Sequence, residues 1–208
     1  MKPWILGITG GIGSGKSSVG RLLASYCLAP LIDVDQCCRH LLETGQPGWQ
    51  ALRAAFGPAY FLPDGGVDRI ALRRRIFEDA DIRRQVDGLL HPLAREALRT
   101  EIGHQHSELV LVEIPLLFEA GWRGEVDEVL VIYARRGARC CRIMRRDGAS
   151  RREAARAIAA QMSLEEKAAC AELVIDNSRQ WTESRVRVVA LGDALACRIP
   201  GRLRKESS

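Results

Sequence analysis

The sequence predicts a three-layer α/β fold in which helices cover a five-stranded parallel sheet. Near the start of the chain, a glycine-rich turn joins a short apolar run to a helical pattern. Further along, the near-continuous apolar runs Leu109–Ile114 and Glu128–Tyr133 are typical of parallel strands that are buried on both faces. The composition fits this class, because 47% of the 208 residues are hydrophobic and 27% are charged, as in ordinary globular chains. Disordered, collagen-like and coiled-coil classes are therefore excluded.

The first elements form a strand–helix–strand unit. Trp4–Thr9 is a short apolar run that ends in glycines, which predicts a buried strand. From Ser17, apolar residues follow helical spacing until the pattern stops near Pro30. Leu31–Asp35 predicts a second strand whose last residues are carboxylates. Such a unit predicts a parallel pair of strands with a right-handed crossover.

The chain between the second and third strands is longer than a crossover requires. Helical patterns extend over residues 35–43, 49–56, 68–77 and 81–102. Gly45–Gly48 interrupts the first two, residues 57–66 predict a loop, and Pro92 predicts a kink or a boundary after His91. The surplus predicts a helical insertion of the kind that binds an acceptor.

The last third of the chain supplies the fifth strand and a lid. Leu173–Asp176 predicts the strand, and helical patterns extend over residues 139–146, 151–167 and 181–199. Gly148, between the first two of these helices, is interpreted as a hinge. We expect a single domain with a core over residues 1–34, 108–135 and 170–200, an insertion over about 35–107 and a lid over about 137–169.

Residues Gly10–Ser17 match the pattern G-x-x-x-x-G-K-[ST] of a phosphate-binding loop. Glycines let the backbone approach a phosphate closely, so that its N–H groups and the following helix N-terminus face the anion. Lys16 would reach the β- and γ-phosphates, and the Ser17 hydroxyl would bind Mg²⁺. A dinucleotide site would require glycine where Lys16 stands, and the only Asn, Asn177, is not in the N-K-x-D motif of regulatory GTPases. The loop therefore predicts a P-loop NTPase fold, and the chain length favours a small-molecule kinase.

Two carboxylates follow the second predicted strand. Asp33 and Asp35 are two residues apart, so on a strand they would share a face at the edge that carries the phosphate loop. One would accept the proton of the attacking hydroxyl, and the other would support Mg²⁺ or the local structure. The structural alternative is that Asp35 is a helix N-cap. Arg39, one turn later, would face the acceptor or else be an ordinary surface residue.

From Leu6 to Asn177, the sequence resembles the dephospho-CoA kinase family. The motifs that carry the resemblance are Thr9–Ser17, Ile32–Asp35 with Arg39, Asp68-Arg69, Ile76-Phe77, His91-Pro92, Ile114–Glu119, Arg142 with Arg145–Asp147, Gln161 and Val174–Asn177. The run Pro-Leu-Leu-Phe-Glu joined to this phosphate loop is far more specific than the loop alone. Arg139 departs from the family, which often has Gln at this position.

This resemblance implies transfer of a phosphoryl group from ATP, with Mg²⁺, to the ribose 3′-hydroxyl of dephospho-CoA, the last step of coenzyme A synthesis. By the family pattern Asp35 would be the base, with Lys16 and Arg142 as further catalytic residues. The nucleotide would be bound by Gly10, Gly11, Ile12, Gly13, Ser14, Gly15, Lys16, Ser17, Ser18, Arg142, Arg146 and Asn177. The acceptor would be bound by Asp33, Asp35, Arg39, His91, Leu116 and Leu117, and the metal by Ser17.

Several of these positions have a structural alternative. Leu116 and Leu117 follow a strand, and leucines there are more often core residues. The alternative for His91 is a solvated side chain beside a helix break. Glu113 would either support Mg²⁺ through water or be buried against a helix. Arg145, next to the two lid arginines chosen above, is interpreted as a solvated charge.

Charge and cysteine content bear on partners and location. The net charge of +5 is mild, and the arginine clusters are interleaved with acids, which indicates solvated helix faces rather than a nucleic-acid surface. No apolar stretch is long enough for a membrane helix, and no export signal is expected. Seven cysteines without a C-x-x-C pair indicate reduced thiols in the cytoplasm.

A kinase for another nucleoside or nucleotide is the alternative function, and an ATP-dependent binding switch is a weaker one. The oligomeric state stays open.

Overall fold

The computed structural model describes residues 2–199, and the chain separates into two compact units. The first unit is formed by the chain up to Ile32 together with the chain from Gln105 onward. The second unit is Asp33–His104. The segment expected to form a lid is part of the first unit rather than a unit of its own.

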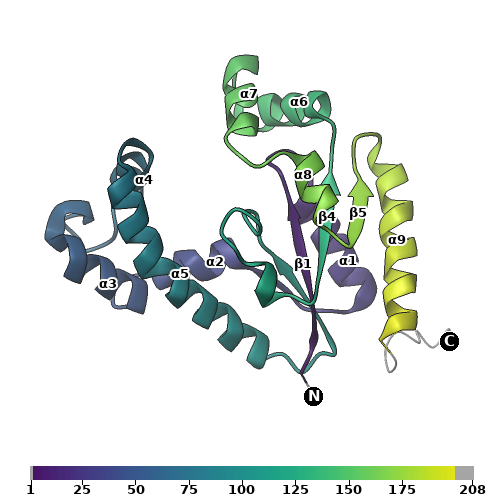
Figure 1. The fold of residues 1–208 in the computed structure, drawn as a ribbon, viewed down its shortest axis with the longest axis horizontal. Helices are drawn as coiled ribbons and strands as arrows, with labels where there is room; N and C mark the ends of the chain where they lie inside the picture. The colour runs from purple at the N-terminus through teal and green to yellow at the C-terminus, as the bar shows by residue number, and fades with distance from the viewer. Residues whose placement is uncertain (1, 200–208) are drawn as a thin grey trace. The chain divides into compact units, whose positions relative to one another are not determined.

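The first unit contains the predicted five-stranded parallel sheet (Figure 1). Its strands, in the spatial order β2-β3-β1-β4-β5, are β2 (Leu31–Asp33), β3 (Leu109–Glu113), β1 (Trp4–Gly10), β4 (Glu128–Tyr133) and β5 (Leu173–Asp176). β1 pairs in parallel with both β3 and β4. The loop that follows β1 therefore leaves the middle of the sheet, where a parallel fold places its ligands.

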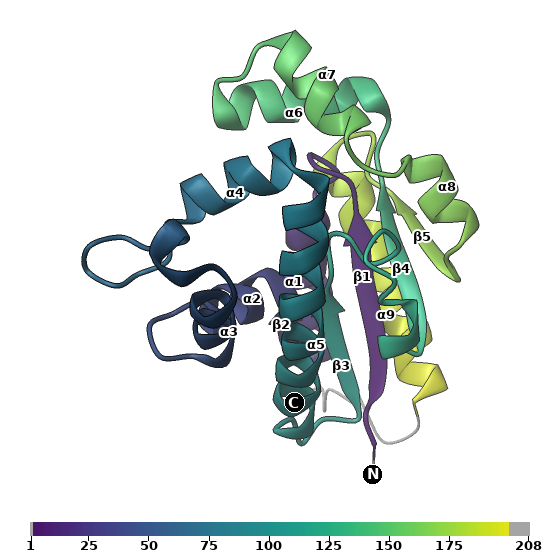
Figure 2. The same cartoon turned by 60° about the vertical axis from the view of Figure 1, so that its left-hand side comes forward.

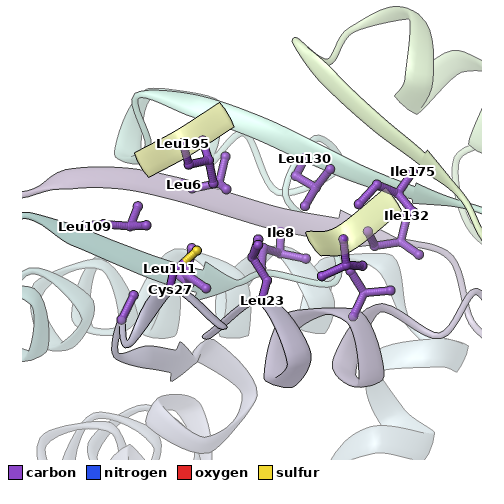
Figure 3. Packing of buried hydrophobic residues seen from close by; sticks show 13 residues of the cluster. Leu6, Ile8, Leu23, Cys27, Leu109, Leu111, Leu130, Ile132, Ile175 and Leu195 are labelled. Atoms are coloured by element: carbon purple, nitrogen blue, oxygen red, sulfur yellow. The ribbon is translucent and has the colours of Figure 1, made fainter. Parts of the chain in front are cut away.

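Alternating residues of β1 face two different environments. Leu6 and Ile8 lie in a buried cluster with residues of α1 (Lys16–Cys27) and α9 (Trp181–Arg198), which pack against each other (Figure 3). Gly7, between them, points to the opposite face, where an added Cβ would lie 3.0 Å from side-chain atoms of Leu117 and Val126. A strand buried on both faces explains why the apolar run of β1 is continuous.

The helices between β4 and β5 differ from the prediction. One helix was expected over residues 151–167, but the structure has α7 (Arg151–Ala159) and α8 (Leu164–Ala169). Each begins with a capping box, in which a serine and the glutamate three residues later satisfy each other's backbone N–H groups. With α6 (Arg136–Asp147), α7 lies beyond the carboxyl ends of β1 and β4 (Figure 2). A short 3₁₀ turn, η2 (Arg123–Glu125), precedes β4.

The second unit is helical and has its own core. Its elements are α2 (Val34–Leu41), α3 (Pro47–Phe56), the 3₁₀ turn η1 (Gly57–Tyr60), α4 (Arg69–Glu78) and α5 (Ala80–Gly103). Leu52, Val67, Leu72 and Val86 are its buried centre. α5 runs without a boundary through Pro92, so a helix end after His91 is not formed.

Candidate active site

The loop between β1 and α1 has the backbone of a phosphate-binding turn. Gly13 and Gly15 have positive φ angles of 76° and 90°, which other residues rarely adopt. The Ser14 N–H donates to the Gly11 carbonyl at 3.0 Å. At Gly15 an added Cβ would lie 2.4 Å from Asn177 Nδ2, so only glycine fits there. The loop leads directly into α1, whose N-terminal N–H groups favour an anion.

Lys16 and Ser17 converge on the carboxylate of Glu113. The Ser17 hydroxyl donates to Glu113 Oε1 at 2.6 Å, and Lys16 Nζ lies 3.0 Å from the same oxygen. Glu113 is the last residue of β3, the strand beside β1, and it is buried. Glu113 is therefore a buried carboxylate against α1, in contact with the two functional side chains of the loop, and its support of Mg²⁺ stays a prediction.

Arg142 and Asn177 bind backbone carbonyls in the second half of the loop. The Arg142 guanidinium donates to the carbonyls of Gly13, Ser14 and Asn177 at 3.3, 3.2 and 2.6 Å. Asn177 is buried, and its Nδ2 donates to the Ser14 carbonyl at 2.7 Å, while its Oδ1 accepts from the Ser184 hydroxyl at 2.7 Å. α6, the end of β5 and α9 are thus joined to the loop by hydrogen bonds.

Two further side chains bind the backbone N–H and carbonyl of Ile12, and sequence reasoning did not assign them a role. The Ile12 N–H donates to Gln161 Oε1 at 2.7 Å, and the Ile12 carbonyl accepts from Arg139 Nε at 2.9 Å. Burial lowers the pKa of the Arg139 guanidinium, and the negative charge of Glu165 partly opposes this shift. The sequence contained one indication of a role for Arg139, because this residue lies one turn before Arg142 on the same helix.

An ion pair with a buried lysine supports the loop after β3. Lys167 of α8 is fully buried; its Nζ lies 2.8 Å from Glu119 Oε1 and donates to the Pro115 carbonyl at 3.2 Å. The Thr9 hydroxyl donates to the same carbonyl at 3.2 Å.

Of the two leucines expected to contact the acceptor, Leu117 is fully buried, in the position against Gly7 described above. Only Leu116 is exposed, at 46%. The interpretation of Leu117 as a substrate contact is therefore corrected: it is a core residue.

The expected strand arrangement of Asp33 and Asp35 is also corrected. β2 ends at Asp33, and Asp35 lies in the first turn of α2. Asp33 is the N-cap, because its Oδ1 accepts from the Asp35 N–H at 2.9 Å. Asp79 and Asp81 at the start of α5 repeat this arrangement, with the same 2.9 Å bond. Asp35 itself is exposed.

A cavity of about 330 Å³, widely open to solvent, lies in the surface of the second unit. Its lining combines the arginines and apolar residues Arg39, Arg69, Arg73, Leu42, Leu72 and Leu90. His91 is not among its lining residues, and His91 Nε2 lies 3.7 Å from Asp87 on the same helix. The cavity can accept a ligand that has both anionic and apolar parts.

Arg146 and Ser18 are the remaining residues expected at the nucleotide. Arg146 is exposed and pairs with its neighbour Asp147 at 2.6 Å. Ser18 is exposed on α1. The structure therefore brings Lys16, Ser17, Arg142 and Asn177 together at the loop, whereas Arg146 has a different partner.

Comparison with known proteins decides the family. The dephospho-CoA kinase family model matches residues 4–183. The chain belongs to the dephospho-CoA kinase family. A dephospho-CoA kinase from Geobacter metallireducens is 41% identical over 190 residues, which cover 90% of this chain and 94% of that protein. A crystal structure from Thermus thermophilus is 37% identical, with a TM-score of 0.82 and coverage of 94% and 98% of the two chains. The structure titled dephospho-CoA kinase from Campylobacter jejuni, at 23% identity and a TM-score of 0.69, shows the same fold.

Membership in the dephospho-CoA kinase family makes the chain a kinase with a nucleotide substrate. The alternative acceptor, another nucleoside or nucleotide, is not favoured by these comparisons. Shikimate kinase from Bacteroides thetaiotaomicron, at 13% identity and a TM-score of 0.55, shares the fold alone. None of the helices in residues 2–199 is both long and apolar enough to cross a membrane.

The oxygen atoms at the loop are suited to bind Mg²⁺, the ion expected from the resemblance to dephospho-CoA kinases. Ser17 and Glu113 offer a hydroxyl and a carboxylate 2.6 Å apart, the hard oxygen ligands that Mg²⁺ prefers. Within the described residues no group of three or more His, Cys, Asp or Glu could form a metal cage. Mg²⁺ in kinases needs no such cage, because phosphates and water complete its coordination.

Proposed function

We propose that this chain transfers the γ-phosphoryl group of ATP to the ribose 3′-hydroxyl of dephospho-CoA, giving coenzyme A and ADP. The observation that carries the proposal is the convergence of Lys16 and Ser17 on Glu113 at the loop after β1, in a chain whose residues 4–183 match the family. The name of the relative that is 41% identical supports dephospho-CoA as the acceptor.

On the nucleotide side, the loop and the N-terminus of α1 bind the phosphates through backbone N–H groups. Lys16 exchanges its contact with Glu113 for the β- and γ-phosphates and neutralises the charge of the transferred group. Ser17, with Glu113 beside it, would hold Mg²⁺, which supplies further neutralisation when it is bound. Arg142 of α6 already donates to the carbonyls of Gly13 and Ser14, and it would turn its guanidinium from these carbonyls to the phosphates. Arg146 would have to leave Asp147 to do the same.

On the acceptor side, we assign Asp35 as the general base. Its carboxylate accepts the proton of the ribose 3′-hydroxyl while that oxygen forms a bond to the γ-phosphorus and the bond to ADP breaks. Asp33 positions Asp35 by capping α2. Arg39, which lines the cavity of the second unit, would bind an anionic part of the acceptor. Leu116 and His91 would be further contacts of the acceptor.

Seven cysteines without a disulfide among the described residues support an assignment to the reducing cytoplasm.

The first test is an ADP-release assay with Mg²⁺ and ATP, in which dephospho-CoA, adenosine and AMP are offered separately. We expect ADP release that depends on dephospho-CoA, with a product one phosphoryl group heavier by mass spectrometry. Turnover with only another acceptor would refute the substrate assignment.

Two variants test the assigned residues. Asp35→Asn should lower kcat by a factor of about 10² to 10⁴, the usual contribution of a general base, without loss of ADP binding. Asp81→Asn is its matched control, because Asp81 occupies the same position after a capping Asp in α5. Lys16→Ala should weaken both ATP binding and turnover. Near-normal turnover of Asp35→Asn would show that another group accepts the proton.

A further inference from the structure

Arg139 lies at the phosphate loop, where it contacts the backbone of the loop directly. Its Nε donates to the Ile12 carbonyl at 2.9 Å, while Gln161 Oε1 accepts from the N–H of the same residue at 2.7 Å. Arg139 is in the first turns of α6, and Gln161 follows α7. Both hydrogen-bonding groups of one loop residue are therefore bound by side chains of the segment 137–169.

The packing around Arg139 is equally close. An added Cβ at Gly11 would lie 2.2 Å from Arg139 Nη2, and one at Gly13 would lie 2.9 Å from the Arg139 carbonyl oxygen. The guanidinium thus lies directly against Gly11, and the backbone of α6 lies against Gly13. Gly13 leaves no room for a side chain, so there the loop and α6 are in direct backbone contact, whereas a side chain at Gly11 would displace the guanidinium itself.

The burial of this arginine is only partly compensated by its hydrogen bond to Ile12. The residue is only 4% exposed, and among the described residues its Nη2 has no hydrogen-bond partner. Burying a cationic donor without a partner disfavours folding. Costly groups of this kind persist where function requires them. A bound polyanion is the ligand that a buried positive charge beside this loop would favour, because the interaction is screened little there.

We propose that Arg139 is a positioning residue of the phosphate loop, which together with Gln161 orients the backbone on both sides of Ile12 and strengthens the binding of nucleoside di- and triphosphates. The inference rests on the proposed use of the loop for ATP. Arg139 would thus add a positive charge behind the loop, on the side away from the nucleotide, and would not contact the transferred phosphoryl group.

The experiment compares Arg139→Gln, Arg139→Lys and a matched control, Arg136→Gln, which removes an exposed arginine of the same helix. The Kd for ADP is measured by calorimetry without any acceptor, and kcat and the two KM values are measured with ATP and dephospho-CoA. We expect Arg139→Gln to weaken ADP binding and raise the KM for ATP about tenfold, the effect of losing one charge-assisted hydrogen bond. The KM for dephospho-CoA should not change, and the thermal midpoint should be unchanged or higher.

The lysine variant and a double variant separate the possible causes. Arg139→Lys retains a charged donor and should bind ADP more tightly than Arg139→Gln. Gln161→Leu removes the other bond to Ile12, so the double variant with Arg139→Gln should lose less affinity than the sum of the two single losses.

Three results would overturn the inference: ADP affinity equal to the wild type in Arg139→Gln, equal affinities in the lysine and glutamine variants, or full additivity. A lower thermal midpoint without any change in nucleotide affinity would assign Arg139 a purely structural role. Absence of ADP binding by the wild type would overturn the proposed function as well. Binding without turnover of dephospho-CoA would affect only the acceptor assignment.

Discussion

Lys167 and Glu119 form an ion pair whose two members differ in burial, and this difference predicts unequal effects of removing either one. The Lys167 side chain is 0% exposed, whereas that of Glu119 is 24% exposed. In Glu119→Gln the ammonium group stays buried without its counter-charge. In Lys167→Met the group that is lost is the one most costly to bury, and the remaining carboxylate reaches water and still accepts from the Met162 N–H at 3.2 Å.

The magnitudes follow from these environments. Leaving a buried charge unpaired lowers the free energy of unfolding by about 3 to 5 kcal/mol, which applies to Glu119→Gln. For Lys167→Met we expect about 1 to 2 kcal/mol, because the hydrogen bond to the Pro115 carbonyl is also lost. Glu119→Gln should therefore be the less stable variant by about 2 kcal/mol.

Urea unfolding followed by circular dichroism measures this difference, provided that the slopes of the transitions agree. Glu183→Gln is the control, since Glu183 lies 3.9 Å from Arg179 in an exposed pair, whose loss should change stability by less than about 1 kcal/mol. If Lys167→Met is as destabilising as Glu119→Gln, or more so, the argument from burial fails.

Three other predictions concern separate parts of the chain. Asn177→Ala leaves the buried Ser184 hydroxyl without its acceptor, so it should lower the unfolding free energy by about 1 to 3 kcal/mol and weaken ADP binding; unchanged urea midpoint and Kd would contradict this. Gly192→Ala places a Cβ 2.3 Å from Tyr26 Cδ1 and should cost about 1 to 3 kcal/mol, with recovery when Tyr26 is also shortened to alanine; an unshifted thermal midpoint would show that the ring moves freely. Burial, aided by nearby acidic charge, raises the pKa of the Cys38 thiol to about 11, so its alkylation at pH 8 should be about a hundredfold slower than that of an ordinary thiol and rise with pH up to about 11, as mass spectrometry after timed iodoacetamide treatment would show. Fast alkylation at pH 8 would refute the raised pKa.

The sheet and the phosphate loop could be predicted because their signals are local. The β-strands are continuous apolar runs, and the loop pattern between β1 and α1 carries its own chemistry. Asp35 was misplaced because the β2 run was extended through it, whereas Asp33 accepts its N–H and begins a helix instead. The break before α8 was also readable, since Ser163 and Glu166 have capping-box spacing.

Other features depend on residues that are distant in the sequence. Arg139 contacts Ile12 across 127 positions, and Gln161 contacts it across 149. Leu117 is a core residue because Gly7 on β1 leaves space for its side chain. The spacing of apolar residues along the sequence does not indicate such contacts, because they form only when the sheet has assembled.

The division of the chain has a consequence for its synthesis on the ribosome. The second unit, Asp33–His104, is one uninterrupted stretch, whereas the first unit needs both ends of the chain. β1 is made first, yet its neighbours β3 and β4 begin only at Leu109 and Glu128, and α9 ends at Arg198. The helical unit can therefore fold while the nascent chain is still growing. The strand that carries the phosphate loop has no partner strand until β3 and β4 are made, so a shorter nascent chain exposes apolar β1 to chaperones and proteases.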